Sequence, residues 1–390
     1  MLARPKLSDE QTDWAREFFL NCRDPVRFAA LADRSFSSPF VMRHSRRIGL
    51  EYAAGGLFKR MSHSAVVLAG QNLLLVAEQS AFHQQCVLPV TERYVYLKGP
   101  AAAQEYYRDL GLRISRDIDI IVHREDYEPL LRRAWSLGFM PLLSPAKDLE
   151  ISDERDFQAL LKYSTNHIVL RTPWGKRVEV HVEVDSKVRI PASAFLDGRN
   201  RVRIDTQDYS IPSINCFFTY LCLHHTRHYF SRAQWVADLA AVSTNPDFSR
   251  FDAERFAEAH GLGDIVASCL SFSDYCERPW LWINENPEGE AGSLLNYCVE
   301  VFGVFPSLER QLSRARHERR AAFSWETTNG IIENVVLKLL RRPFSLRDEK
   351  YALLRYYIRC PLPSYVQFLY VFPRIVDGIK RNLHSDRNEH

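Results

Sequence analysis

Two aspartates at the head of an apolar run constrain the fold of this chain more than any other feature. Residues 113–123 read RISRDIDIIVH, so Asp117 and Asp119 stand one residue apart just before an apolar stretch. Alternate residues of a strand point to the same face, which places the two carboxylates together while Ile118 and Ile120 face the other way. Burying like charges without a partner is costly. The segment therefore predicts a strand whose polar face needs a cation, and Mg²⁺ suits it because this ion binds one or two carboxylates, waters and phosphate oxygens.

A second polar strand face appears in residues 178–185, VEVHVEVD, where valines alternate with acidic residues and a histidine. Glu179, His181, Glu183 and Asp185 share one face, and the valines between them share the other. The valines belong in a core, whereas the polar face either meets solvent or lines a site. Glu179 is the candidate for a third carboxylate. For His181, a role at the site and exposure to solvent are equally consistent with the pattern.

A glycine turn precedes both polar strands. Residues 96–99, YLKG, end a short predicted strand and are followed by a predicted helix that closes at Gly111. A glycine at such a turn lets a phosphate approach the backbone. Lys98 would add a positive charge, and Arg113 and Ser115 would add donors just before the aspartates. The glycine turn, helix, DxD strand and later acidic strand together predict a site for a metal-bound triphosphate.

The order of the predicted elements indicates an α+β chain with a small central domain. Residues 1–90 look helical, beginning after a capping Ser8 and including an apolar stretch at 65–77 that is too short to span a membrane. Residues 91–195 read as strand, helix, strand, helix and then a two-stranded hairpin around Pro-Trp-Gly, which predicts a small mixed sheet. Residues 196–390 are again mostly helical.

The composition is that of an ordinary globular chain. The 390 residues are 25% charged and 46% hydrophobic, and a net charge of +3 does not by itself indicate nucleic-acid binding. The eight cysteines are scattered without a CxxC pair, which favours reduced thiols over a disulfide framework or a zinc site. The N-terminus lacks the apolar segment of a signal peptide, so we expect a cytoplasmic protein without a membrane span.

Together these motifs resemble the DNA polymerase β-type nucleotidyltransferase superfamily, in which a glycine turn, a helix, an acidic-x-acidic strand and a third acidic residue follow in this order. More narrowly, residues 93–240 resemble a poorly characterised bacterial group with the motifs LKG, RxxxDID and VExH, followed by HxxxH and WxxD on later helices. The matching residues are Lys98, Gly99, Arg113, Asp117, Ile118, Asp119, Glu179, His181, His224, His228, Trp235 and Asp238. The segment RISRDID also resembles the RxSxDxD element of nucleotidyltransferase toxins.

The resemblance implies a polymerase β-like core flanked by helical regions, and an enzyme that moves a nucleoside monophosphate from an NTP, expected to be ATP, to an acceptor with release of pyrophosphate. Asp117, Asp119 and Glu179 would be catalytic and would hold Mg²⁺ or Mn²⁺. The residues expected to bind the nucleotide are Lys98, Gly99, Arg113 and Ser115. One departure affects the turn: the superfamily has Gly-Ser or Gly-Gly there, whereas here Pro100 follows the glycine and has no N–H to offer a phosphate.

Two other interpretations remain at this stage. A phosphotransferase on the same fold would transfer the γ-phosphoryl group, and a non-catalytic nucleotide-binding module would transfer nothing; the intact set of three carboxylates weighs against the module. His224, His228 and Asp238 are substrate-facing candidates or structural residues, with a zinc site at the two histidines as the weaker alternative. The acceptor is a small molecule, a peptide, a protein or tRNA, and the sequence does not select among them.

Overall fold

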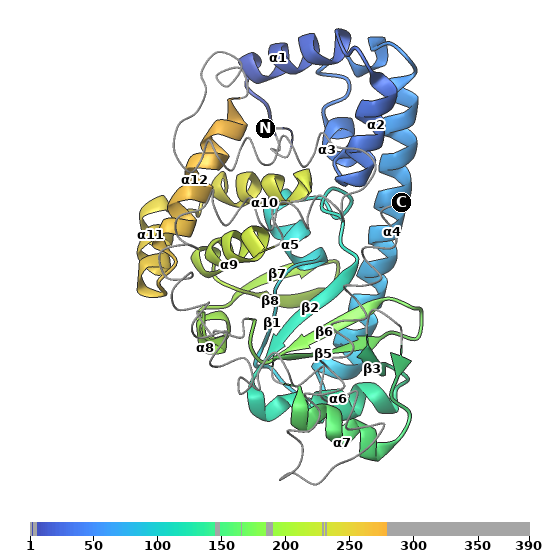
Figure 1. Ribbon diagram of the computed structural model, residues 1–390, viewed down its shortest axis with the longest axis vertical. Coiled ribbons are helices and arrows are strands. Elements are labelled where there is room, and N and C mark those ends of the chain that lie inside the picture. The colour runs from blue at the N-terminus through green and yellow to red at the C-terminus, as the bar shows by residue number, and fades with distance from the viewer. Residues whose placement is uncertain are drawn as a thin grey trace, which may run out of the picture.

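The computed structural model has an α+β fold in which helices surround one mixed sheet and one hairpin (Figure 1). The described residues are Leu2, 6–144, 149–164, 166–184, 190–227, Phe230 and 232–278. Helices from the N-terminal region form one end of the molecule, and helices α6 (Arg124–Ser136) and α7 (Glu154–Tyr163) lie at the other end, beyond the sheet.

The sheet has the strand order β1-β2-β6-β5-β3-β4 within the described residues. The strands are β1 (Tyr94–Tyr96), β2 (Asp117–Val122), β3 (Met140–Ser144), β4 (Leu149–Glu150), β5 (His167–Arg171) and β6 (Arg177–His181). Strands β2 and β6 run parallel, and the other neighbours pair antiparallel. The predicted small mixed sheet is thus confirmed, and the two acidic segments lie on adjacent strands.

Strand β6 is shorter than the alternating sequence predicts. We expected the strand to run through residues 178–185, but its pairing ends at His181, which lies opposite the first residue of β5, His167. Beyond that point the N–H groups of Val182 and Glu183 both donate to the carbonyl of Asn166. The alternation continues in the sequence, but the strand pairing of the described residues stops at His181, and Asp185 lies outside the described residues.

The helix after the glycine turn also differs from the prediction. Helix α5 (Pro100–Ala102) continues directly as a π-helical turn, Ala103–Tyr107, and Arg108 ends it in the left-handed conformation with φ of +54°. The predicted end at Gly111 is therefore wrong. Two successive tyrosines of this turn, Tyr106 and Tyr107, are both buried.

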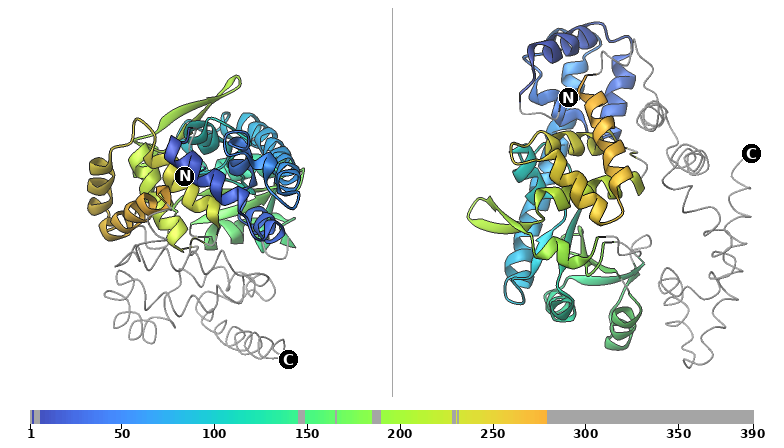
Figure 2. Two further views of the ribbon diagram at one scale, coloured as in Figure 1. Left: turned by 90° about the horizontal axis from the view of Figure 1, so that it is seen from above. Right: turned by 90° about the vertical axis from the view of Figure 1, so that its left-hand side faces the viewer.

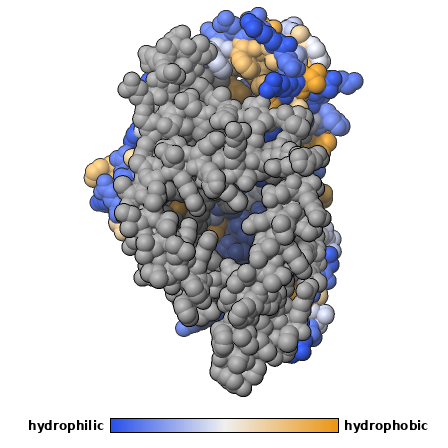
Figure 3. Space-filling model, viewed as in Figure 1, coloured by the Kyte–Doolittle hydropathy of each residue, from blue (hydrophilic) through white to orange (hydrophobic). Residues whose placement is uncertain are grey.

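The N-terminal region is helical, as predicted. It contains α1 (Asp9–Leu20), α2 (Pro25–Arg34), α3 (Ser38–Arg43), a 3₁₀ turn (Leu50–Tyr52) and α4 (Leu57–Phe82). Ser8 caps α1 through a capping box with Gln11, which confirms the predicted start of that helix. Apolar surface is visible at this end of the molecule (Figure 3), where Phe18, Leu20 and Val26 are exposed.

Helix α4 connects the N-terminal region to the sheet. Together with the π-helical turn His83–Val87 it forms the segment Leu57–Val87, which among the described residues is the one helix long and apolar enough to cross a membrane by length and composition. It is longer than the apolar stretch recognised in the sequence. Its inner face belongs to the core of this fold: Leu75 and Phe82 are fully buried, and the Glu78 carboxylate accepts a hydrogen bond from the Thr172 hydroxyl.

The described part of the C-terminal region contains the predicted helices. It also contains one hairpin, which the sequence analysis did not predict. The hairpin strands are β7 (Asn200–Ile204) and β8 (Gln207–Ile211), and the helices are α8 (Ala192–Leu196), α9 (Ile214–Arg227), α10 (Ala233–Ser243), α11 (Arg250–Ala259) and α12 (Gly263–Glu277). The two-residue turn has Asp205 in the left-handed conformation, a weaker sequence signal than Asn-Gly. The helices predicted after residue 278 lie outside the described residues.

The largest hydrophobic cluster of the described residues spans all three regions, and the N-terminal helices form a second cluster of their own. A single cluster of buried side chains includes Phe40, Ile120, Phe218 and Phe272, which come from the N-terminal, central and C-terminal regions. Helix α12 also lies beside the N-terminal helices (Figure 2), where the Gln11 amide donates to the Glu277 backbone carbonyl at 3.2 Å. The position of the site therefore depends on packing between segments that are distant in the sequence.

Candidate functional site

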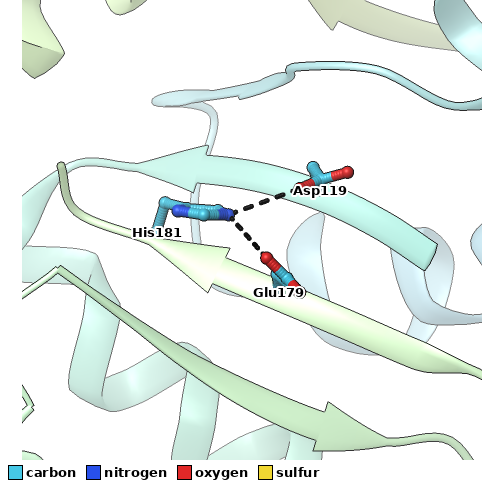
Figure 4. A group of neighbouring side chains, drawn as sticks. All are labelled: Asp119, Glu179 and His181. Carbon is cyan, nitrogen blue, oxygen red and sulfur yellow. Dashed lines mark ion pairs between the residues drawn. The ribbon is translucent and has the colours of Figure 1, made fainter. Parts of the chain in front are cut away.

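Three side chains from two adjacent strands converge on one point. Asp119 on β2 lies opposite Glu179 on the parallel strand β6, and His181 follows two residues later on the same face of β6. The Nε2 atom of His181 is 3.5 Å from Asp119 Oδ1 and 3.6 Å from Glu179 Oε2 (Figure 4). One ligand atom from each residue lies within 4.8 Å of the others, which is a spacing suited to a metal ion.

A lysine from the glycine turn faces the same carboxylate. Lys98 Nζ is 3.2 Å from Asp119 Oδ2 and 3.2 Å from His224 Nε2. The turn lies here because the Leu97 N–H donates to the Asp119 carbonyl at 3.0 Å, which extends the pairing between β1 and β2. The buried Asp119 therefore has two cationic neighbours, the ammonium of Lys98 and the imidazole of His181.

These neighbours set the protonation of the carboxylates. Burial disfavours the charged form of Asp119, but Lys98 and His181 outweigh it and hold the pKa of Asp119 well below its usual range. Asp117 is half-buried, and burial together with the charge of Asp119 raises its pKa to about 6. Burial opposes protonation of His181, yet Asp119 and Glu179 raise its pKa to about 9. Two neighbouring aspartates thus have different electrostatic environments.

The donor set fits a divalent cation. A metal ion would bind the neutral form of His181 and displace its proton. The charges of Asp117, Asp119 and Glu179 would then exceed that of Lys98 by two. Among the described residues, Asp119 Oδ2 and both ring nitrogens of His181 lack a well-aligned hydrogen-bond partner although they are buried. Carboxylates favour Mg²⁺ or Mn²⁺, and an added imidazole nitrogen favours Mn²⁺ and its heavier neighbours. The converging set contains His181, for which the sequence analysis left open whether it belongs to the site or meets solvent. Asp117 lies on the same face of β2 as Asp119 and stays a predicted ligand.

Gly99 is required by the backbone of the turn. Its φ of +78° and ψ of −153° lie in a region that is essentially restricted to glycine. A Cβ at this position would meet the Gln79 side chain only at ordinary contact distance, so the requirement comes from the dihedral angles and not from crowding. The following Pro100 is buried and has no N–H to offer a ligand.

Arg113 is bound to a carboxylate of the chain. Its Nε and Nη2 atoms donate to Asp238 Oδ1 and Oδ2 at 2.8 and 2.9 Å, and its Nη1 donates to the Ser115 hydroxyl at 3.0 Å. Asp238 also accepts a hydrogen bond from the Tyr107 hydroxyl at 2.7 Å. Arg113 is 4% exposed and Asp238 is 2% exposed. The assignment of Arg113 and Ser115 to nucleotide binding, and that of Asp238 to the substrate, stay predictions; their contacts in the fold are with one another.

Helix α9 contributes two histidines. His224 contacts Lys98, and its Nδ1 lies 3.1 Å from Nδ1 of His225. His225 is fully buried, and its Nε2 is 3.2 Å from Asp238 Oδ2. Burial lowers the pKa of His225 despite that carboxylate. The sequence analysis missed His225; the doublet HH followed by Asp238 was the available signal, and His228 lies outside the described residues.

His167 is a second residue that the sequence analysis missed. It opens β5 opposite His181, and the two rings are 4.9 Å apart between centroids. Burial and the nearby His181 lower the pKa of His167 to about 4. No motif marked His167, because its position depends on the register between β5 and β6.

Fold and site together define a nucleotidyltransferase-like protein: a small mixed sheet with acidic residues on two adjacent strands beside a glycine turn. Residues 21–275, which are more than half of the chain, match the family described as uncharacterised nucleotidyltransferase, and the chain belongs to that family. Membership supports a transferase and implies an NTP as substrate. No protein of curated function and no solved structure matches the chain.

Proposed function

We propose that this protein transfers a nucleoside monophosphate from an NTP, with ATP as the expected donor, to a hydroxyl or phosphate of an acceptor. The acceptor oxygen bonds to the α-phosphorus, and the bond from that phosphorus to the bridging oxygen breaks, with its electron pair leaving on pyrophosphate. A hydroxyl acceptor releases its proton to water. The observation that carries the proposal is the register of β2 and β6, which sets Asp119 beside Glu179 and His181 in a chain of this family.

In this proposal Asp119, Glu179 and His181 hold the cation, with Asp117 as a further ligand at the half-buried end of β2. A divalent ion bound there would supply positive charge to the phosphates and lower the pKa of an acceptor hydroxyl. Lys98 keeps Asp119 ionised and fixes its carboxylate toward the other ligands. His224 fixes Lys98 in turn from helix α9.

Radiolabelled donors test the type of transfer. The protein is incubated with Mg²⁺ or Mn²⁺, a host lysate and ATP labelled in either the α- or the γ-phosphate, and the labelled fractions are separated. The proposal expects the α-label on an acceptor and the γ-label in pyrophosphate. The γ-label on the acceptor would identify a phosphotransferase instead, and nucleotide binding without any transfer would identify a binding module. The labelled fraction also identifies the acceptor as small molecule, peptide, protein or tRNA.

A further inference from the structure

Two arginines beside the carboxylate site share one aromatic ring. The guanidinium carbons of Arg116 and Arg232 lie 4.8 and 5.0 Å from the ring centroid of Phe36. Arg232 also lies 5.4 Å from the ring centroid of Trp235. Cation–π contacts of this kind fix the plane of a guanidinium while leaving its N–H edge available for an anion.

Neither of these arginines has a carboxylate partner among the described residues. Arg113 is bound to Asp238, and Arg93 and Arg132 are likewise paired with carboxylates. Arg116 is exposed and Arg232 is half-buried. Burial, and then the charge of Arg116, lower the pKa of Arg232, while Asp117 opposes this effect. Asp117 is the opposite charge that acts on Arg232, and it does not outweigh burial and the charge of Arg116. A bound anion would further relieve the repulsion between the two guanidinium groups.

The fold places this arginine pair next to the carboxylate site. Arg116 directly precedes Asp117 in the sequence. On the other side, Trp235 stacks on the ring of His225 at 5.5 Å with an angle of 9° between the planes. His225 adjoins His224, the residue that contacts Lys98. The arginine pair and the carboxylates are therefore connected through both β2 and α9.

Three distant segments are joined at this point. The Gln234 side chain accepts from the Ile114 N–H at 3.1 Å and donates to its carbonyl at 2.8 Å, and the Gln234 N–H donates to the Ser35 carbonyl at 3.4 Å. Phe36 itself has φ of +55°, which is uncommon for an aromatic residue and is strained. It is 7% exposed. A strained, buried aromatic residue is therefore the one that both guanidinium groups contact.

The cations first expected to bind the nucleotide already have carboxylate partners within the chain. Lys98 faces Asp119, and Arg113 faces Asp238. A triphosphate beside three carboxylates nevertheless needs positive charge beyond that of a metal ion. We propose that Arg116 and Arg232 form an anion subsite for the β- and γ-phosphates of the NTP and for the departing pyrophosphate. This inference rests on the proposed function. Two guanidinium groups suit two adjacent phosphates better than the single negative charge of a phosphodiester.

Binding of inorganic tripolyphosphate tests the subsite without requiring turnover. Isothermal titration with Mg²⁺ present compares the wild type with Arg116→Ala, Arg232→Ala and the double variant. Each single change should weaken tripolyphosphate and ATP about tenfold or more, because each removes a charge-assisted contact, and the double variant should weaken them further. AMP affinity should stay within about twofold, since AMP has no β- or γ-phosphate. Arg201→Ala, at an exposed arginine of β7, is the matched control and should bind as the wild type does.

Several outcomes would overturn the subsite. These are unchanged tripolyphosphate affinity in Arg116→Ala with an unchanged melting temperature, an equal loss of AMP and tripolyphosphate, and no tripolyphosphate binding by the wild type. Arg116 is exposed, so its variant tests the proposal even if Arg232→Ala fails to fold. The proposed function is tested separately by the α-label experiment. If the variants lose tripolyphosphate binding but the wild type transfers no α-label, the subsite is supported and the transferase is rejected. If the wild type transfers the α-label but the double variant binds tripolyphosphate normally, the transferase is supported and the subsite is rejected.

Discussion

At the scale of single residues, Asp119 and Asp117 show how position along one strand gives two identical side chains different pKa values. Asp119 is 2% exposed and lies between Lys98 and His181, so it is ionised. Asp117 lies two residues earlier at the half-buried end of β2, with no ion pair among the described residues, and its pKa is raised to about 6 by burial and by Asp119. The same-face pair predicted from the sequence therefore contains one fixed anion and one carboxyl that titrates near neutrality.

Glu179 and Glu183 provide a matched test of the site. Glu179→Gln removes a charge from the converging set, so transfer of the α-label should fall about a hundredfold or more. Glu183→Gln should retain transfer within about twofold of the wild type, because this residue follows the end of β6 and its carboxylate is 4.0 Å from Arg124. Initial rates with α-labelled ATP measure both variants. Equal losses would mean that the polar face of β6 has been assigned to the wrong residue.

Asp238 is expected to contribute to stability. Asp238→Asn leaves the buried guanidinium of Arg113 without its counter-charge, so the free energy of unfolding should fall by about 3–5 kcal/mol. Glu154→Gln is the control, because Glu154 pairs with Arg132 at 3.0 Å on the surface, where solvent screens the pair, and the urea midpoint of this variant should stay close to that of the wild type. Urea unfolding followed by circular dichroism measures both. A change of less than about 1 kcal/mol in Asp238→Asn would contradict a structural role for this ion pair.

At the scale of elements, helix α4 positions the loop that leads into β2. The Asn72 side chain accepts a hydrogen bond from the Ser115 N–H at 3.0 Å and donates to the Leu110 carbonyl. Asn72 is fully buried although it lies within an apolar helical segment. A polar residue at this position is explained by the two backbone groups that it satisfies. Helix α4 thus helps to align Asp117 and Asp119 as well as packing against the sheet.

Replacing Asn72 tests this connection. Asn72→Leu leaves the Ser115 N–H and the Leu110 carbonyl without their partner, and the free energy of unfolding should fall by about 2 kcal/mol or more even though leucine favours helices. Gln71→Leu alters the exposed neighbour on the same helix and should change stability by no more than about 0.5 kcal/mol. Thermal and urea unfolding report the difference. Similar stability in the two variants would show that the loop does not depend on Asn72.

At the scale of the whole molecule, buried histidines make the stability depend on pH. His83 is 1% exposed beneath Tyr96 and Tyr209, and burial lowers its pKa to about 4 from the usual 6.5. Below pH 6.5 the unfolded chain binds a proton at this site before the folded chain does. Stability from this histidine is therefore complete above pH 6.5 and falls as the pH decreases from 6.5 toward 4.

His83→Gln should reduce this sensitivity while keeping a hydrogen-bonding side chain beside the Tyr96 hydroxyl. The decrease in melting temperature between pH 7.5 and pH 5 should be smaller in the variant by a few degrees. It should not vanish, because the pKa of His167 is also lowered to about 4. His63→Gln, at an exposed position of α4, should show the full wild-type decrease. Equal decreases in all three proteins would exclude His83 as a source of the pH dependence.

Several local elements and the two acidic strands could be predicted from the amino-acid sequence. Strand β2, the hairpin of β5 and β6, and the capping of α1 by Ser8 follow from periodicity and turn chemistry within short windows. The carboxylates of Asp117 and Asp119 were recognisable because two charges at the head of an apolar strand need a cation. These features depend on neighbours in the sequence, which a single chain displays directly.

The cations and other partners that those side chains meet depend on contacts between segments distant in the sequence. Lys98 reaches Asp119 because β1 pairs with β2, and His181 and His167 meet because of the register between β5 and β6. The pairing of Arg113 with Asp238 and the stacking of Arg116 and Arg232 on Phe36 join segments more than 70 residues apart. Such contacts are selected by burial and charge compensation over the whole fold, and no periodicity in the sequence encodes them.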